Sequence, residues 1–180
     1  YESDLCDAFI DSLCSSIRRM NIDHLHILGD IYDRGSSPHR VMDLLERFAR
    51  FDIQWGNHDI VWLGAASGRA VCCADVVRIA LRYANIDVLE KGYGINLLPL
   101  MSLAGEEYGK DTDLGPFLPR FSGENVDLSK QTIARMHKAI TIIQFKLESA
   151  LYRRNPGYQM QQRDLMGRTD FVSGTVEIEG

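Results

Sequence analysis

Six polar side chains at two turns are of the types that handle a metal ion and a phosphate. They lie in the stretches GDIYDRG (29–35) and GNHD (56–59), and they are Asp30, Asp33, Arg34, Asn57, His58 and Asp59. Carboxylate and amide oxygens ligate hard divalent cations, and a guanidinium offers a planar fork that matches phosphate oxygens. An imidazole can give up a proton near neutral pH. Together these residue types predict a site that binds divalent metal and phosphate.

The metal part of this site would depend on Asp30 and Asn57. A carboxylate such as that of Asp30 can bridge two cations, because it has two oxygens and a full negative charge. The amide oxygen of Asn57 would fill a coordination place without adding charge. Two bridged metals would acidify a shared water and turn it into the nucleophile.

The phosphate part of the site would depend on the other four residues. Arg34 is expected to hold phosphate oxygens, and Asp59 is expected to clamp its guanidinium. His58 would protonate a leaving alkoxide, while Asp33 would orient that imidazole and raise its pKa. The first turn alone is also compatible with a solvated ion pair, since Asp, Arg and Gly are common in turns. The second turn, at a matching position, favours the functional interpretation.

Two short apolar stretches directly before the turns must position these groups. HLHIL (24–28) predicts a buried strand that ends in the first turn, and RFDIQW (50–55) predicts a strand that ends in the second. Ser37 and Pro38 predict the start of a helix between them, with a capping hydroxyl and a proline at the first helical position. The buried stripe of this helix is predicted to be Val41, Leu44, Leu45 and Phe48.

The order strand, helix, strand predicts a parallel pair with a right-handed crossover. Because the carboxyl ends of parallel strands meet at one edge, where ligands bind in open sheets, the two turns are expected to form one crevice.

Helices are predicted over most of the remaining chain. Apolar residues at intervals of three or four predict an amphipathic helix near the start, through Leu5, Phe9, Leu13, Ile17 and Met20. Further helices are predicted over 61–83 (broken near 66–70), over 94–105 and from Ser129 to 154, with a loop over 111–127. The tail predicts one strand that pairs with something outside these residues. We therefore expect a core segment (1–65), a helical insertion (66–165) and the start of a returning core strand (166–180).

Both turns, in this order and at predicted strand ends, resemble those of the calcineurin-like metallophosphoesterases. The longer stretch HLHILGDIYDRG…FDIQWGNHDIVWLGA is similar to the class III fructose-1,6-bisphosphatases of bacteria, as are residues 74–100 and TIIQFKLE (141–148). The resemblance covers most of the chain. It implies an α/β fold, with a partial calcineurin-like core built on a parallel βαβ unit, followed by a helix-rich segment, as a fragment of a larger sandwich.

The resemblance also implies an activity. Members of this family hydrolyse the 1-phosphate of fructose 1,6-bisphosphate in gluconeogenesis, with water activated by a binuclear Mn²⁺ site. By motif position, Asp30 would be the bridging ligand and Asn57 a ligand of the second metal. Arg34 would hold phosphate, and His58 would be the proton donor paired with Asp33. The implied partner is a small sugar phosphate.

The sequence departs from the family pattern at the two ends of the site. The family has an upstream Asp-x-His at a strand end, but Asp23, His24 and His26 lie at or before the start of the strand that ends near Asp30. At a rise of about 3.3 Å per residue, His26 would lie roughly 13 Å from Asp30. The upstream ligands are therefore expected to lie outside these residues.

Downstream, the family has two histidines on later strands. His137 is predicted to pack within a helix rather than to ligate metal, and His39 is predicted to be solvated. Since the chain also starts with Tyr1, we expect a fragment that is inactive by itself. Lys91, Tyr93 and Arg120 are open candidates for selecting the sugar.

Other functions with the same turns stay open at this point: a protein serine/threonine phosphatase, a dinucleoside polyphosphate hydrolase, or a regulatory relic without activity. The net charge of −5 and the pI near 5.5 argue against nucleic acid as a partner. No apolar run approaches the ~18 residues of a membrane span, and no charged-then-apolar stretch is visible, so neither a membrane span nor secretion is expected. The four cysteines lack metal-binding spacing, which predicts buried or half-buried free thiols in a reducing cytoplasm. A homo-oligomer stays open.

Overall fold

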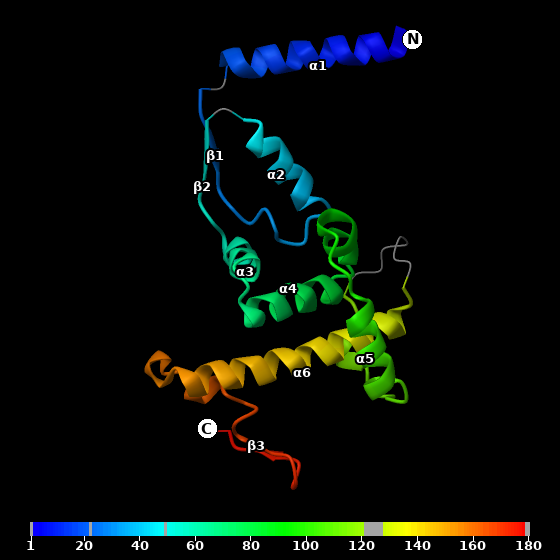
Figure 1. The fold of residues 1–180 in the computed structure, drawn as a ribbon, viewed down its shortest axis with the longest axis vertical. Coiled ribbons are helices and arrows are strands. Elements are labelled where there is room, and N and C mark those ends of the chain that lie inside the picture. The colour runs from blue at the N-terminus through cyan, green and yellow to red at the C-terminus, as the bar shows by residue number, and fades with distance from the viewer. Residues whose placement is uncertain (1, 22, 49, 121–127, 179–180) are drawn as a thin grey trace.

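The computed structural model describes residues 2–21, 23–48, 50–120 and 128–178 as a helix-rich α/β chain (Figure 1). The helices and strands are α1 (Glu2–Asn21), β1 (Leu25–Ile27), α2 (Pro38–Glu46), β2 (Phe51–Ile53), α3 (Asn57–Ala66), α4 (Ala70–Arg82), α5 (Leu98–Tyr108), α6 (Lys130–Arg154), β3 (Thr169–Asp170) and β4 (Thr175–Val176). Shorter turns are the π-helical η1 (Val88–Gly92) and the 3₁₀ segments η2 (Gly115–Phe117), η3 (Pro156–Tyr158) and η4 (Gln161–Arg163). Among the described helices, none combines the length and the apolar character needed to cross a membrane.

The two predicted strands pair in parallel, and α2 is the crossover between them (Figure 1). The register joins Leu25 to Phe51 and Ile27 to Ile53. The N–H of Gln54 extends the pairing, since it donates to the carbonyl of Ile27 at 2.8 Å. The predicted βαβ unit is thus confirmed. Within the described residues this sheet has two strands, so the calcineurin-like sandwich stays a prediction.

The strands are less buried than the sequence predicts. Side chains alternate between half-buried and exposed positions in both strands. Leu28, directly after β1, is 78% exposed. The prediction of a buried strand is therefore wrong, because a two-stranded sheet has few neighbours to cover its faces.

Helix α2 begins with Pro38 at its first turn, as predicted, but it differs from the prediction in two respects. Ser37 makes no side-chain capping hydrogen bond, because its ψ of 53° departs from the extended backbone that an N-cap residue adopts. Of the predicted stripe, Leu45 is buried, whereas Val41 and Leu44 are exposed. Little packs against the outer side of α2 in the described part of the chain.

Helix α1 forms as predicted, yet its apolar face is not covered. Leu5 is 75% exposed and Phe9 is 68% exposed. Figure 1 shows the reason: α1 lies at one end of the molecule, apart from the other helices, while the β3–β4 hairpin lies at the opposite end.

The main hydrophobic core lies in the helical segment rather than at the sheet. Helix α6 packs against α4 and α5, and α3 packs against α4. The large apolar side chains with less than 2% exposure are Leu81, Leu89, Ile133 and Met136. This segment therefore supplies most of the packing that holds the described residues together.

The predicted ends of the long helix are confirmed. The Ser129 hydroxyl accepts a hydrogen bond from the N–H of Thr132 at 3.1 Å, which caps the start of α6. The helix ends at Arg154, before Asn155 and Pro156. The predicted loop over 111–127 contains η2, and its residues 121–127 lie outside the described ranges.

The tail differs from its prediction. It forms two short strands that pair with each other, with Thr169 opposite Val176. The turn between them is closed locally, because the Asp170 carboxylate accepts hydrogen bonds from the N–H of Val172 and the hydroxyl of Ser173. Pairing of the tail with a strand from outside these residues stays a prediction.

The four cysteines are free thiols, as predicted. Cys14 and Cys72 are partly buried, whereas Cys6 and Cys73 are exposed. The prediction that all four thiols are buried or half-buried is therefore wrong for Cys6 and Cys73.

Candidate metal and phosphate site

The two predicted turns meet at the carboxyl ends of β1 and β2. The N–H of His58, in the first turn of α3, donates to Oδ1 of Asp30 at 3.3 Å. A Cβ on Gly29 would lie 2.2 Å from the carbonyl oxygen of Gln54, and a Cβ on Gly56 would lie 2.1 Å from Oδ1 of Asp30. These glycines therefore allow the two turns to approach each other so closely.

Asp59 is fully buried and joins the two turns. Its Oδ2 accepts hydrogen bonds from the N–H groups of Asp30 at 2.6 Å and Gly56 at 2.9 Å. Its Oδ1 accepts one from the N–H of Tyr32 at 3.1 Å. The predicted clamp on Arg34 is therefore wrong. As the third residue of α3, Asp59 satisfies backbone donors beside the helix start and cannot reach outward to a guanidinium.

Asp33 lies between a guanidinium and an imidazole. Arg34 donates from Nε to Oδ1 of Asp33 at 2.7 Å and from Nη2 to Oδ2 at 3.0 Å. Nε2 of His58 lies 3.2 Å from the same Oδ1. The hydrogen bond from Arg34 lowers the pKa of Asp33 below its usual value, and the charge of His58 contributes in the same direction. The arrangement suits the predicted orientation of His58 by Asp33, although its role as proton donor stays a prediction.

The first turn has a strained backbone. Asp30 has a φ of 53° and Arg34 a φ of 56°, both in the left-handed region that non-glycine residues rarely adopt. Two backbone hydrogen bonds close the turn. The N–H of Asp33 donates to the carbonyl of Asp30 at 3.1 Å, and the N–H of Arg34 donates to the carbonyl of Tyr32 at 3.2 Å. Such strain persists where surrounding contacts enforce it, as the bonds to Asp59 do here.

The donors for a metal are incomplete in this part of the molecule. Asp30 and Asn57 are both exposed, and they carry a carboxylate and an amide oxygen. Among the described residues, no group of three or more His, Cys, Asp or Glu side chains could hold a metal ion. Two oxygen donors do not complete the coordination of a divalent cation. A binuclear centre therefore does not fit these residues by themselves.

The upstream histidines lie away from the turns, as predicted. Nδ1 of His26 contacts Oδ2 of Asp52 on the neighbouring strand at 2.5 Å, and His24 contacts the other oxygen of the same carboxylate. Hydrogen bonds to His24 and His26 lower the pKa of Asp52 below its ordinary value. Both imidazoles therefore serve the pairing of β1 and β2.

The two other histidines are packed against neighbours. His137 is 2% exposed, and its Nδ1 bonds with the carbonyl oxygen of Phe117 at 2.8 Å, which confirms a packed helix residue. Burial lowers its pKa. His39 is half-buried rather than solvated, because η1 packs beside the start of α2. Its ring meets Tyr93 edge-on, with centroids 6.1 Å apart.

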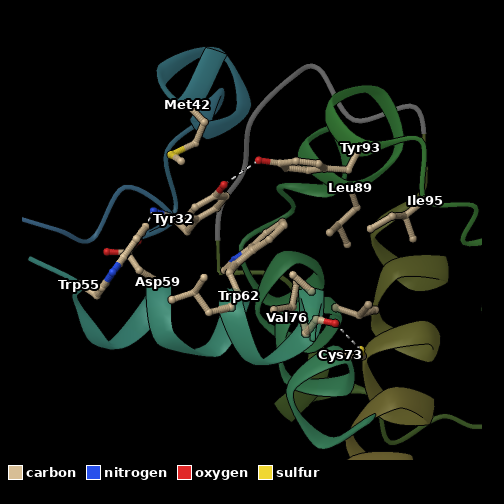
Figure 2. Close-up of a pocket in the computed structure, with 14 residues that line it drawn as sticks. Tyr32, Met42, Trp55, Asp59, Trp62, Cys73, Val76, Leu89, Tyr93 and Ile95 are labelled. Atoms are coloured by element: carbon tan, nitrogen blue, oxygen red, sulfur yellow. Dashed lines mark hydrogen bonds between the residues drawn. The ribbon is translucent and has the colours of Figure 1, made fainter. Parts of the chain in front are cut away.

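Aromatic side chains line an apolar hollow behind the first turn (Figure 2). The Tyr32 ring stacks on Trp62 of α3 with centroids 4.6 Å apart, and its hydroxyl hydrogen-bonds with that of Tyr93 at 2.8 Å. Burial raises the pKa of Tyr93, and the bond to Tyr32 adds to this effect. The hollow has a volume of about 430 Å³. Sequence reasoning missed Tyr32, although an aromatic residue between two candidate site carboxylates is a visible signal.

A parallel strand pair with converging polar turns thus defines an α/β protein with a candidate phosphate site. The chain belongs to the family described as Firmicute fructose-1,6-bisphosphatase, whose family model matches residues 1–180. This confirms the resemblance drawn from the two turns. No solved structure matches the chain.

Curated relatives carry the name "Fructose-1,6-bisphosphatase class 3". The chain is 51% identical over 174 residues to one from Porphyromonas gingivalis. This match covers 96% of the chain and 27% of that relative. It is 50% identical over 175 residues to one from Phocaeicola vulgatus, covering 96% of the chain and 26% of the relative. It is 49% identical over 173 residues to one from Fusobacterium nucleatum, and this match covers 96% of the chain and 26% of the relative. The chain therefore spans about a quarter of the length of these relatives.

Proposed function

We propose that these residues are part of a metal-dependent fructose-1,6-bisphosphatase, which hydrolyses the 1-phosphate of fructose 1,6-bisphosphate to give fructose 6-phosphate and phosphate. The observation that carries this proposal is the family match over residues 1–180. The contact of Asp33 with both Arg34 and His58 supports it, because a guanidinium and an imidazole beside one carboxylate are groups that phosphate binding and proton donation would need. We assign the activity to gluconeogenesis in the cytoplasm.

In this proposal each residue has one task. Arg34 binds the phosphate oxygens, and His58 gives its proton to the departing alkoxide oxygen of the sugar. Asp33 holds the imidazole in place and neutralises it once protonated. Asp30 and Asn57 would hold Mn²⁺ only together with donors from outside these residues, and the metal would supply the activation of water.

The incomplete donor set favours a second proposal for the 180 residues alone. By themselves they are catalytically inactive and amount to a binding or regulatory module. Two oxygen donors retain a divalent cation only weakly, so the fragment is expected to stay inactive even with added Mn²⁺.

The test compares the full-length protein that carries this chain with residues 1–180 alone. With Mn²⁺, release of phosphate from fructose 1,6-bisphosphate is expected from the full-length protein only. His58→Ala in the full-length protein should lower kcat by about 10²- to 10⁴-fold, the range of general acid catalysis. Faster turnover of a phosphopeptide or a dinucleoside tetraphosphate would contradict the proposal. Turnover by residues 1–180 would contradict their assigned inactivity.

A further inference from the structure

We propose that a hollow between the first turn and the end of α4 binds the part of the sugar phosphate that is not hydrolysed. Its volume is about 440 Å³, and its lining residues are Arg34, Ser36, Tyr83, Ala84 and Asn85. A guanidinium, two hydroxyls and an amide suit a ligand with several hydroxyls and a second phosphate. The inference rests on the proposed function, and it adds the residues that select the substrate.

Arg34 connects this hollow with the reacting groups. Two of its N–H groups bond to Asp33, whose Oδ1 is 3.2 Å from Nε2 of His58. A guanidinium has further N–H donors, which can serve a ligand in the hollow. The Arg34 guanidinium carbon lies 5.1 Å from the centre of the Tyr83 ring, a cation–π distance that holds it against this wall. A sugar in the hollow would therefore have one phosphate near His58.

Asn85 fixes the wall opposite the turn. Its side-chain N–H donates to the carbonyl of Gly35 at 2.9 Å, and its backbone N–H donates to the carbonyl of Ala80 at 2.8 Å. The side-chain amide oxygen of Asn85 can accept a hydrogen bond from a sugar hydroxyl.

The backbone at this wall is strained in the same way as the first turn. Ala84 has a φ of 53°, in the left-handed region. Within the described ranges, four non-glycine residues have such a backbone, and three of them border the site: Asp30, Arg34 and Ala84. Strain of this kind concentrates at sites that hold a ligand.

The apolar hollow behind the first turn does not suit a sugar phosphate. Figure 2 shows its aromatic and aliphatic lining, with Trp62, Val76 and Leu89 among the side chains. The Tyr32 hydroxyl there is already bonded to Tyr93. Sugar hydroxyls buried against such a lining would lose hydrogen bonds to water without replacement. The hollow beside Arg34 has a guanidinium, hydroxyls and an amide in its lining and is therefore the better match.

The test uses Tyr83→Phe and Ser36→Ala in the full-length protein. Tyr83→Phe keeps the ring beneath the guanidinium and removes the hydroxyl, including its interaction with Arg34. A change in Arg34 alone would affect both of the phosphoesters compared below. The measurement is kcat/KM for fructose 1,6-bisphosphate and for p-nitrophenyl phosphate, which has no sugar. For each variant, kcat/KM is expected to fall at least about tenfold more for the sugar phosphate than for the aryl phosphate. The same variants should weaken product inhibition by fructose 6-phosphate more than inhibition by inorganic phosphate.

Tyr158→Phe is the matched control, because Tyr158 is exposed and lies in η3, away from the hollow. It should keep the wild-type ratio between the two substrates. If Tyr83→Phe and Ser36→Ala also keep that ratio while the wild type hydrolyses fructose 1,6-bisphosphate, the sugar site is refuted and the proposed function stands. If the wild type hydrolyses neither phosphoester, the proposed function fails, and the sugar site fails with it.

Discussion

The carboxylate of Asp59 holds together the two turns that carry the candidate site. It is buried, and it accepts backbone hydrogen bonds from Asp30, Tyr32 and Gly56. Because these donors come from both turns, one side chain sets the distance between Asp30 and the start of α3. The neighbouring Asp33 acts outward, on Arg34 and His58, so the acidic residues of the two motifs have different tasks.

At this scale we predict the effect of Asp59→Asn. Both carboxylate oxygens accept hydrogen bonds from backbone N–H groups. In either orientation of the asparagine amide, its NH₂ group would therefore face a backbone N–H, and neither group could accept a hydrogen bond from the other. The substitution should lower the free energy of unfolding by about 1–3 kcal/mol, the cost of an unsatisfied buried group. Urea denaturation of the chain would measure this change. Asp7→Asn, at an exposed position of α1, is the control and should leave the midpoint unchanged.

At the scale of elements, the segment before η2 is tied to α6 by an ion pair. Nζ of Lys138 lies 2.5 Å from Oδ2 of Asp111, and the N–H of Asp113 donates to Oδ1 of the same carboxylate at 2.9 Å. The hydrogen bond from Lys138 lowers the pKa of Asp111, and the backbone bond adds to this. The ammonium also lies 5.5 Å from the ring centres of Tyr108 and Phe117, so α5, η2 and α6 meet at one cation.

The lowered pKa of Asp111 predicts how its contribution to stability depends on pH. A carboxyl whose pKa is lower in the folded state stabilises the fold at pH values above its pKa in the unfolded chain, which is about 3.9. This stabilisation is lost as the pH falls through the pKa of the folded state. Asp111→Asn should therefore lower the thermal midpoint at pH 7 and have a smaller effect at about pH 3. An equal effect at both pH values would show that the carboxylate charge is not responsible. Asp113→Asn provides the exposed control.

At the scale of the whole molecule, packing is uneven. The helical segment has its own core around α6, whereas α1 and the two-stranded sheet are sparsely covered in the described residues. The chain spans about a quarter of the length of the curated relatives it matches. A long exposed apolar face such as that of α1 is typical of a surface that another part of a protein covers.

The uneven packing predicts different results from two leucine truncations in residues 1–180. Leu81→Ala removes a side chain with 0% exposure and should lower the free energy of unfolding by about 2–5 kcal/mol. Leu5→Ala removes one that is 75% exposed, and its effect should stay within about 0.5 kcal/mol. Both measurements use urea denaturation. A comparable loss from Leu5→Ala would mean that the face of α1 is packed in solution.

Several features of the protein follow from its sequence alone. Helical spacing, the Ser129 cap and the Asn155–Pro156 end predicted the long helix, because such signals act between residues that are close along the chain. The order of the strands and the motifs predicted that the two turns meet, since the carboxyl ends of parallel strands share an edge. The family followed from the same motifs.

Burial and the choice of partners were decided only by the tertiary structure. Asp59 bonds to backbone N–H groups instead of Arg34. Tyr83, which directly follows α4 and lies 49 positions after Arg34 in the chain, packs against the guanidinium. The apolar face of α1 is exposed, although its pattern is that of a buried face. The physical reason is the same in each case. A side chain's type limits which contacts it can make, but which groups lie within reach of it depends on how distant segments pack.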